Sequence, residues 1–412
     1  MLWRSGVWKI ANRPTREAGS REQQSYFMET REKSTMKEVV PSPSRALVVR
    51  SAAIVARGLR DLARDSNWLL KKVFSGRSSH LAISQHGELC ALSPMVRHGT
   101  ERLTLYDIEL SVPTLALAIP GEPSVSVPGL PAVFAWSPAG RYLTAAWGGW
   151  LPELHVFDID GKAYLGAFGD FAHFPTSLVW SSAGKYFACA SGGGEGARLR
   201  LWEAAPQTSS AMPFAAEPSI ELGAPPALDV TAEGEFAEHS DDEADDHGVF
   251  SGYGRTTFSP DENVLATVLE NDGDWADDSI ALLEVPSLRM QKISQAQGRV
   301  TDLSWTFDSH QLIYCAAGQA YRIVPESGAA EPLPFGAELC ACHPHLPLGL
   351  FFSAWLKNSA KGRIFVADLN CLRVFDEYPA EGVVDLRWSA DGAKAYAVTA
   401  EGLAYIYEPP LL

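Results

Sequence analysis

The hydrophobic and polar residues of this chain repeat a short pattern between residues 80 and 400. Each copy reads as an alternating strand, a tight turn, and a second strand rich in Ala, Tyr, Leu and Val. The clearest copy is AWSPAGRYLTA, in which Pro138 presets the second turn position and Gly140 permits turn geometry that other residues resist. We count seven copies, with serine-equivalent positions at Ser84, Ser137, Ser181, Ser259, Thr306, His343 and Ser389.

A third strand follows most copies and ends in an aromatic or aliphatic residue plus an acid, as in Phe157-Asp158 and Trp202-Glu203. A serine-proline turn followed by such a dipeptide resembles the WD40-repeat β-propeller family over roughly residues 66–408. The Gly-His dipeptide that opens many such repeats is missing, and the Trp-Asp dipeptide survives only in related forms. The resemblance implies a ring of small four-stranded sheets.

The end of the repeat region predicts how the ring closes. The last copy stops after its third strand, at residues 403–408, which leaves an outer sheet edge without a partner. The segment Trp68–Phe74 has strand character and no copy of its own, so we predict that it is the fourth strand of the last blade. The predicted fold class is therefore an all-β, seven-bladed WD40-like β-propeller, closed by an N-terminal strand and spanning residues 66–412.

Two segments precede the predicted ring. Residues 1–43 are polar and are predicted to be disordered. Residues 44–65 carry apolar side chains on one side of a helical projection and arginines on the other, which predicts a short amphipathic helix. Docking on the propeller rim is favoured over binding of its 45–65 stretch to an anionic membrane surface, because Asp61 and Asp65 weaken a membrane-facing side.

Composition narrows the class of protein. The net charge of −16 argues against a nucleic-acid backbone as the ligand. This charge is uneven, with a net of +8 over residues 1–75 and −24 over the remainder. Six sparse cysteines do not form a disulfide framework, and no secretory signal is visible, so we expect a cytoplasmic protein.

One string of residues resembles a metal site: Cys340-Ala-Cys342-His343-Pro-His345. Zinc needs about four converging ligands, whereas Cys340 and Cys342 fall where other copies place core residues and His343 begins the turn. Buried thiols are the favoured interpretation, and no metal is expected. The chain also lacks GxSxG, HExxH and paired CxxC motifs, so we expect no cofactor and no enzymatic activity.

Four tryptophans, Trp136, Trp180, Trp305 and Trp388, occupy one equivalent position of the repeat. An aromatic ligand-binding ring and a set of packing residues between blades are the two interpretations. Recurrence at one structural position favours packing, because buried aromatic area holds neighbouring blades together.

An acidic insertion is predicted at about residues 224–252. Its stretch Glu233–His247 holds eight carboxylates and two histidines, which indicates a solvated, flexible segment suited to weak recruitment of a basic peptide. The glycine-rich stretch Gly192–Gly196 lacks the spacing of a phosphate-binding loop and is interpreted as a connection between strands.

Long connections fall mainly between the second and third strands of the copies, and in a propeller these open on one face. They carry tryptophans outside the packing position and a cluster of acids. Such aromatics on a rigid scaffold are typical recognition elements, although each could instead cap its own blade. We therefore predict a protein-interaction scaffold that binds a basic or amphipathic peptide or protein partner on this face. The predicted partner-binding residues are Trp147, Trp150, Trp275, Trp355, Asp272, Asp274, Asp277 and Asp278.

An alternative function remains open from the sequence alone. The central mouth of the ring suits an enzyme or a small-ligand binder, with calcium held by the oxygen-rich loop from Asp272 to Asp278. That loop lacks the spacing and the terminal Glu of an EF-hand loop.

Overall fold

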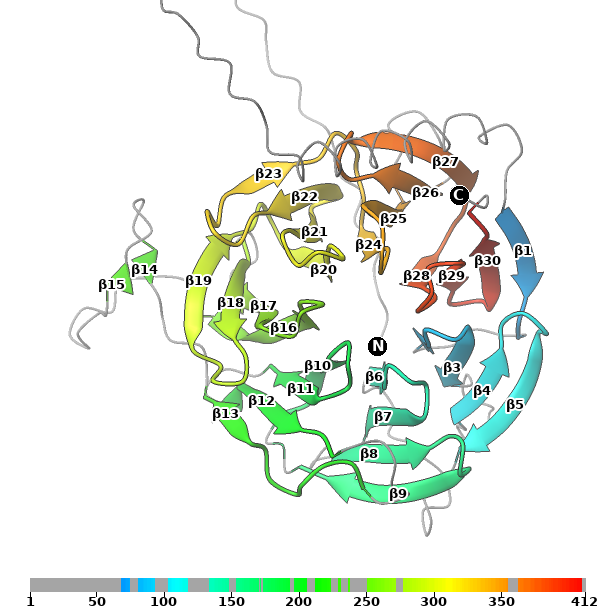
Figure 1. Ribbon diagram of the computed structural model, residues 1–412, viewed down its shortest axis with the longest axis horizontal. Coiled ribbons are helices and arrows are strands. Elements are labelled where there is room, and N and C mark those ends of the chain that lie inside the picture. Colours follow the sequence, from blue (N-terminus) through cyan, green and yellow to red (C-terminus); the bar gives the residue numbers. More distant parts are fainter. Residues whose placement is uncertain are drawn as a thin grey trace, which may run out of the picture. The chain divides into compact units, whose positions relative to one another are not determined.

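The computed structural model describes residues 68–74, 81–92, 103–117, 133–147, 153–169, 171, 173–192, 196–205, 212–223, 229–230, 236–237, 250–271, 277–354 and 362–409. All of them lie in the compact unit Ala53–Leu412. They form a β-propeller whose four-stranded sheets surround a central channel (Figure 1). No helix in these residues is long and apolar enough to cross a membrane.

Six blades each consist of four consecutive, antiparallel strands. The first three are β2 (Leu81–Ile83), β3 (Glu88–Leu92), β4 (Leu103–Asp107) and β5 (Val112–Leu117); β6 (Val133–Trp136), β7 (Tyr142–Trp147), β8 (Glu153–Asp158) and β9 (Ala163–Phe168); and β10 (Pro175–Trp180), β11 (Tyr186–Ser191), β12 (Arg198–Glu203) and β13 (Ile220–Leu222). The next three are β16 (Phe250–Phe258), β17 (Val264–Asn271), β18 (Ser279–Glu284) and β19 (Met290–Gln295); β20 (Val300–Trp305), β21 (Leu312–Ala316), β22 (Gln319–Ile323) and β23 (Ala330–Pro332); and β24 (Leu339–Cys342), β25 (Leu348–Ser353), β26 (Arg363–Asp368) and β27 (Arg373–Pro379).

The remaining four-stranded sheet joins both ends of the ring. Its strands are β28 (Val383–Trp388), β29 (Ala395–Thr399), β30 (Leu403–Tyr407) and β1 (Trp68–Lys72), in the order β1-β30-β29-β28. β1 pairs antiparallel with β30, and the ring centroids of Trp68 and Tyr407 lie 4.8 Å apart. The predicted use of this segment as the closing strand is confirmed, because β1 covers the edge that β30 would otherwise expose.

The predicted fold class needs correction. Six blades are contiguous in the chain, and the last copy supplies three strands of a composite sheet that β1 completes. The described residues also contain no α-helix. The predicted helix at 44–65 and the predicted disorder of residues 1–43 concern segments outside the described residues.

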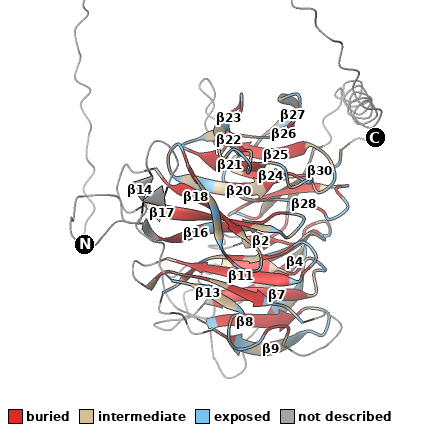
Figure 2. Cartoon of the chain, turned by 60° about the vertical axis from the view of Figure 1, so that its left-hand side comes forward, coloured by how far each residue is buried: buried red, intermediate tan, exposed pale blue. Residues whose placement is uncertain are grey.

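Packing between blades explains the repeated tryptophans. The innermost strands β2, β6, β10, β16, β20, β24 and β28 contact one another in ring order, and buried residues concentrate inside the sheets (Figure 2). The indole N–H of Trp136, Trp305 and Trp388 donates to a carbonyl of the preceding inner strand, at 3.1, 3.3 and 3.0 Å. These bonds and the burial of Trp180, which is 7% exposed, confirm the packing interpretation.

The serine of the motif holds the turn that follows it. In five copies its hydroxyl accepts the backbone N–H five residues later, as for Ser137 and Tyr142 at 2.9 Å, and in the first copy Ser84 accepts from Glu88 at 2.9 Å. Gly140 has a φ of 71°, which supports the predicted turn geometry. The motif is therefore a device for building inner hairpins.

The acidic insertion follows β13, the outer strand of the third contiguous blade. Between β13 and β16 the structure describes only a short antiparallel pair, β14 (Asp229–Val230) and β15 (Phe236–Ala237). The rest of the acidic stretch lies outside the described residues.

Candidate functional site

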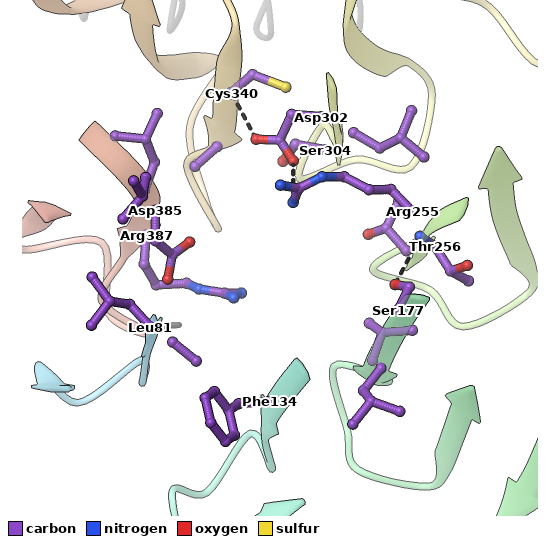
Figure 3. Close-up of a pocket in the computed structure, with 18 of the residues that line it drawn as sticks. Leu81, Phe134, Ser177, Arg255, Thr256, Asp302, Ser304, Cys340, Asp385 and Arg387 are labelled. Atoms are coloured by element: carbon purple, nitrogen blue, oxygen red, sulfur yellow. Dashed lines mark hydrogen bonds and ion pairs between the residues drawn. The ribbon is translucent and has the colours of Figure 1, made fainter. Parts of the chain in front are cut away.

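The central channel contains a cavity of about 540 Å³ (Figure 3). Residues from all of the innermost strands line it. Its size is within the range of about 300–1,000 Å³ that is typical of ligand sites. The channel is therefore the first place to look for binding chemistry.

Strand alternation determines which side chains line this cavity. Ser177, Asp302 and Asp385 each stand three residues before a packing tryptophan, and Arg255 stands three residues before Phe258, which occupies the tryptophan position in its blade. The residues two before the tryptophans, such as Leu386, are buried in the blades. Side chains of a strand point alternately to its two sides, so polar groups at the three-before position reach the channel and the neighbouring seam.

These polar groups hold neighbouring blades together. Asp302 Oδ2 accepts the N–H of Cys340 at 2.9 Å, and Asp385 Oδ2 accepts the N–H of Ile83 at 2.9 Å. The hydroxyl of Ser177 accepts the N–H of Thr256 at 3.1 Å. One oxygen of each carboxylate is therefore committed to the seam between two blades.

On one side of the channel the remaining charge is neutralised. Arg255 Nη1 lies 3.0 Å from Asp302 Oδ1, so both oxygens of this carboxylate are engaged. The arginine side chain is 52% exposed and the aspartate side chain 13% exposed. This ion pair bridges β16 and β20 and leaves little net charge on that side.

The charged groups on the opposite side of the channel, on β28, are arranged differently. Asp385 and Arg387 stand two residues apart on the same side of the strand, and Arg387 extends into the channel in Figure 3. Among the described residues, no carboxylate lies within 4.0 Å of the Arg387 guanidinium and no hydrogen bond forms to it. Burial raises the pKa of Asp385, and the positive charge of Arg387 opposes that rise.

The thiols that line the channel have raised pKa values. Burial raises the pKa of Cys342 to about 12, and the pKa of Cys340 is also raised, first by its contact with the Cys315 thiol and then by burial. The Cys342 Sγ lies 3.6 Å from the Ser304 carbonyl, where other blades place the indole bond. A thiol reacts as its thiolate, so these raised pKa values disfavour a nucleophilic role, and both residues pack in the hydrophobic cluster between their blade and the preceding one.

The neighbouring histidine is also structural. His343 Nδ1 accepts the N–H groups of His345 and Leu346 at 3.0 Å each, so its hydrogen is on Nε2 and is donated to the Gly392 carbonyl at 3.1 Å. Burial lowers its pKa to about 4. This ring replaces the serine hydroxyl of the other turns. The described residues hold no cluster of three His, Cys, Asp or Glu able to bind a metal.

The predicted partner-binding residues belong to connections between the second and third strands of their blades. The observed strand order agrees with this assignment of the connections. Trp147 ends β7, and its side chain lies outside the description, as do Trp150, Trp275 and Trp355. Asp272 and Asp274 also lie outside the described residues. Their role remains a prediction.

Asp277 and Asp278 are described. Asp277 is half-buried, and Asp278 is 3% exposed. The Asp278 carboxylate accepts the N–H of Asn271 at 3.3 Å and that of Val300 at 2.7 Å, which ties two strands of its blade to the next blade. Burial raises its pKa. Asp278 is therefore an internal structural residue and contributes little exposed charge to the loop face.

Sequence reasoning missed the four charged residues of the channel. The alignment of the copies held a signal, because these residues interrupt inner strands that are otherwise apolar or hydroxyl-bearing. Arg255, Asp302 and Asp385 each stand three residues before the packing residue of their strand. Arg387 stands one residue before the packing residue of its strand.

The fold and its channel define a β-propeller. No protein-family model matches the sequence, and no curated protein matches it. Among solved structures, the chain is similar to Kuenenia stuttgartiensis hydrazine synthase, with a TM-score of 0.55 and 16% identity over 82% of this chain and 97% of that one. In all, 1605 chains of solved structures match, and such a widespread fold identifies the architecture and no activity.

Proposed function

We propose that this protein is a non-enzymatic, WD40-like interaction module that binds a protein or peptide partner at the mouth of its central channel. The observation that carries the proposal is the contrast between the two sides of the channel. The charges of Arg255 and Asp302 neutralise each other, whereas Arg387 projects into the cavity without a partner among the described residues. A rigid frame that presents an unpaired guanidinium is suited to recognition.

Several features support binding over catalysis. The channel thiols have raised pKa values, and one oxygen of each channel carboxylate is held by a backbone N–H. The calcium alternative is weakened at Asp278, whose carboxylate accepts two backbone N–H groups. The tryptophan-bearing connections of the loop face are proposed to enlarge the contact around the channel mouth.

Site-specific photo-crosslinking tests this function. A photoreactive phenylalanine analogue replaces Val384, which lines the cavity and is 43% exposed. The matched control carries the analogue at Leu110, which is 70% exposed and lies between the outer strands β4 and β5. We expect a discrete protein or peptide adduct from position 384 and none of that mass from position 110. Equal labelling from both positions, or none from 384, contradicts the proposal.

A further inference from the structure

The charges that line the channel indicate what part of a partner enters it. The cavity has four charged lining residues, Arg255, Asp302, Asp385 and Arg387, so its formal charges cancel. The ion pair between Arg255 and Asp302 uses one charge of each sign. What remains is a guanidinium with five donors and, on the same strand, one carboxylate oxygen, Asp385 Oδ1, that makes no hydrogen bond to the described residues.

The geometry points to Arg387 as the anchor for a carboxylate, which we infer is carried by the partner as an acidic side chain or a chain terminus. This inference rests on the proposed function. A guanidinium binds a planar carboxylate through two parallel, charge-assisted N–H···O bonds. Asp385 Oδ1 is available to accept an N–H of the same ligand.

The neighbouring acid selects among anions. Asp385 lines the cavity beside Arg387, and its negative charge opposes the entry of a second anionic charge. One unpaired guanidinium compensates a singly charged carboxylate, whereas a phosphate near neutral pH brings additional charge. The surrounding inner strands contribute the hydroxyls of Ser177 and Ser304, which already accept backbone N–H groups and can donate their hydrogens.

Calorimetric titration of the purified full chain tests this assignment with defined probes. N-acetylglutamate amide carries a side-chain carboxylate, N-acetylalanine carries a terminal one, N-acetylglutamine amide is the neutral counterpart, and inorganic phosphate is the competing anion. We expect at least one carboxylate probe to bind about 10-fold more tightly than both the neutral probe and phosphate. The probe that binds better identifies the source of the carboxylate.

Substitutions at one position separate charge from geometry. Arg387→Gln is expected to weaken carboxylate binding by about 10-fold or more, and Arg387→Lys to restore only part of it, because an ammonium lacks the planar fork. The matched control, Arg373→Gln, removes an exposed positive charge from the outer strand β27 and should leave binding unchanged. Thermal unfolding of each variant verifies the fold.

Three results overturn the inference: Arg387→Gln binds like the parent, Arg373→Gln weakens binding equally, or phosphate binds more tightly than both carboxylate probes. The crosslink from position 384 separates this failure from failure of the proposed function. If that adduct persists in Arg387→Gln while the probes do not depend on Arg387, the channel mouth binds a partner without the carboxylate contact. If the adduct is absent in the parent chain, the proposed function itself fails.

Discussion

The seams between blades and the channel that they enclose are built from the same innermost strands, but they use polar groups differently. At the seams, backbone N–H groups and three of the four packing indoles are paired across the blade boundary, as in Trp388 to the Ala341 carbonyl and Cys340 N–H to Asp302. In the channel, Arg387 has no such partner among the described residues. Since a paired polar group contributes to stability and an unpaired one is available to a ligand, substitutions in the two regions should affect different properties.

Removal of the closing strand should have the largest effect. A chain that begins at Ser75 lacks β1, so β30 loses its hydrogen-bonded neighbour and Tyr407 loses the Trp68 ring. We expect a loss of about 5 kcal/mol or more in the free energy of unfolding, comparable with the whole stability of a typical domain, together with concentration-dependent association through the open edge. Denaturant unfolding and light scattering measure the two effects.

A chain that begins at Asn67 is the control for this truncation, because it retains all of β1. Equal destabilisation of both truncated chains would show that the preceding residues, and not the pairing of β1 with β30, are responsible.

Trp388→Ala should have the next largest effect, and it concerns a seam. The side chain is 3% exposed, and its indole N–H donates to Ala341 O at 3.0 Å. We expect a loss of about 3–5 kcal/mol from the cavity and the missing bond. Trp388→Phe should lose only about 1 kcal/mol, since Phe258 fills the equivalent position in another blade. Denaturant titration compares the two variants, and equal losses would contradict a packing role.

The seams were predictable from the sequence, and the channel was not. Trp136, Trp305 and Trp388 recur at one register position, and recurrence reports a packing requirement shared by all blades. Channel residues differ from blade to blade, so Arg387 has no repeated counterpart to draw attention to it. Whether Arg387 has an ion-pair partner depends on where the neighbouring carboxylates point, and the fold, not the local sequence, determines that orientation.

The same reasoning explains the outcome for the predicted acidic surface. Asp278 belongs to an acid-rich loop in the sequence, and its composition suggested an exposed charge. Asp278 precedes β18, and its carboxylate instead accepts two backbone N–H groups, one from β17 and one from β20. Composition indicates how many charges a loop holds, whereas hydrogen bonding decides which of them reach the surface.

Asp302→Ala and Arg387→Ala compare a residue of the seam with a residue of the channel, and their expected effects are of intermediate size. The first leaves the Cys340 N–H without its acceptor and Arg255 without its ion-pair partner, so we expect a loss of about 2 kcal/mol in stability. The second removes an exposed side chain and should change stability by less than about 0.5 kcal/mol while it weakens binding of the carboxylate probes. Unfolding and calorimetry on both variants provide the measurements, and a loss of stability at Arg387 would assign it to the seam.

The smallest expected effect is a pH dependence at Asp385. Burial raises the pKa of this carboxyl in the folded protein, so the folded state binds its proton more tightly than the unfolded state. The free energy of unfolding should therefore fall as pH rises from the unfolded pKa of about 3.9 through the folded pKa, and it should stay lower above that value. Asp385→Asn removes this titration while its carbonyl can still accept the Ile83 N–H. We expect the variant to gain stability relative to the parent at pH 7, and we expect that gain to vanish in acid.

Asp391→Asn provides a control of opposite sign. The hydrogen bond from Ser389 lowers the pKa of Asp391, so the stability that this carboxylate contributes is present above the unfolded pKa and is lost as pH falls. The variant should be less stable than the parent at pH 7, and the two should converge in acid. Chemical denaturation of both variants from pH 3 to pH 8 measures the two differences. If Asp385→Asn instead loses stability at pH 7 like Asp391→Asn, the ionised Asp385 carboxylate stabilises the seam, and Asp385 then belongs with Asp302 among the groups that hold the ring closed.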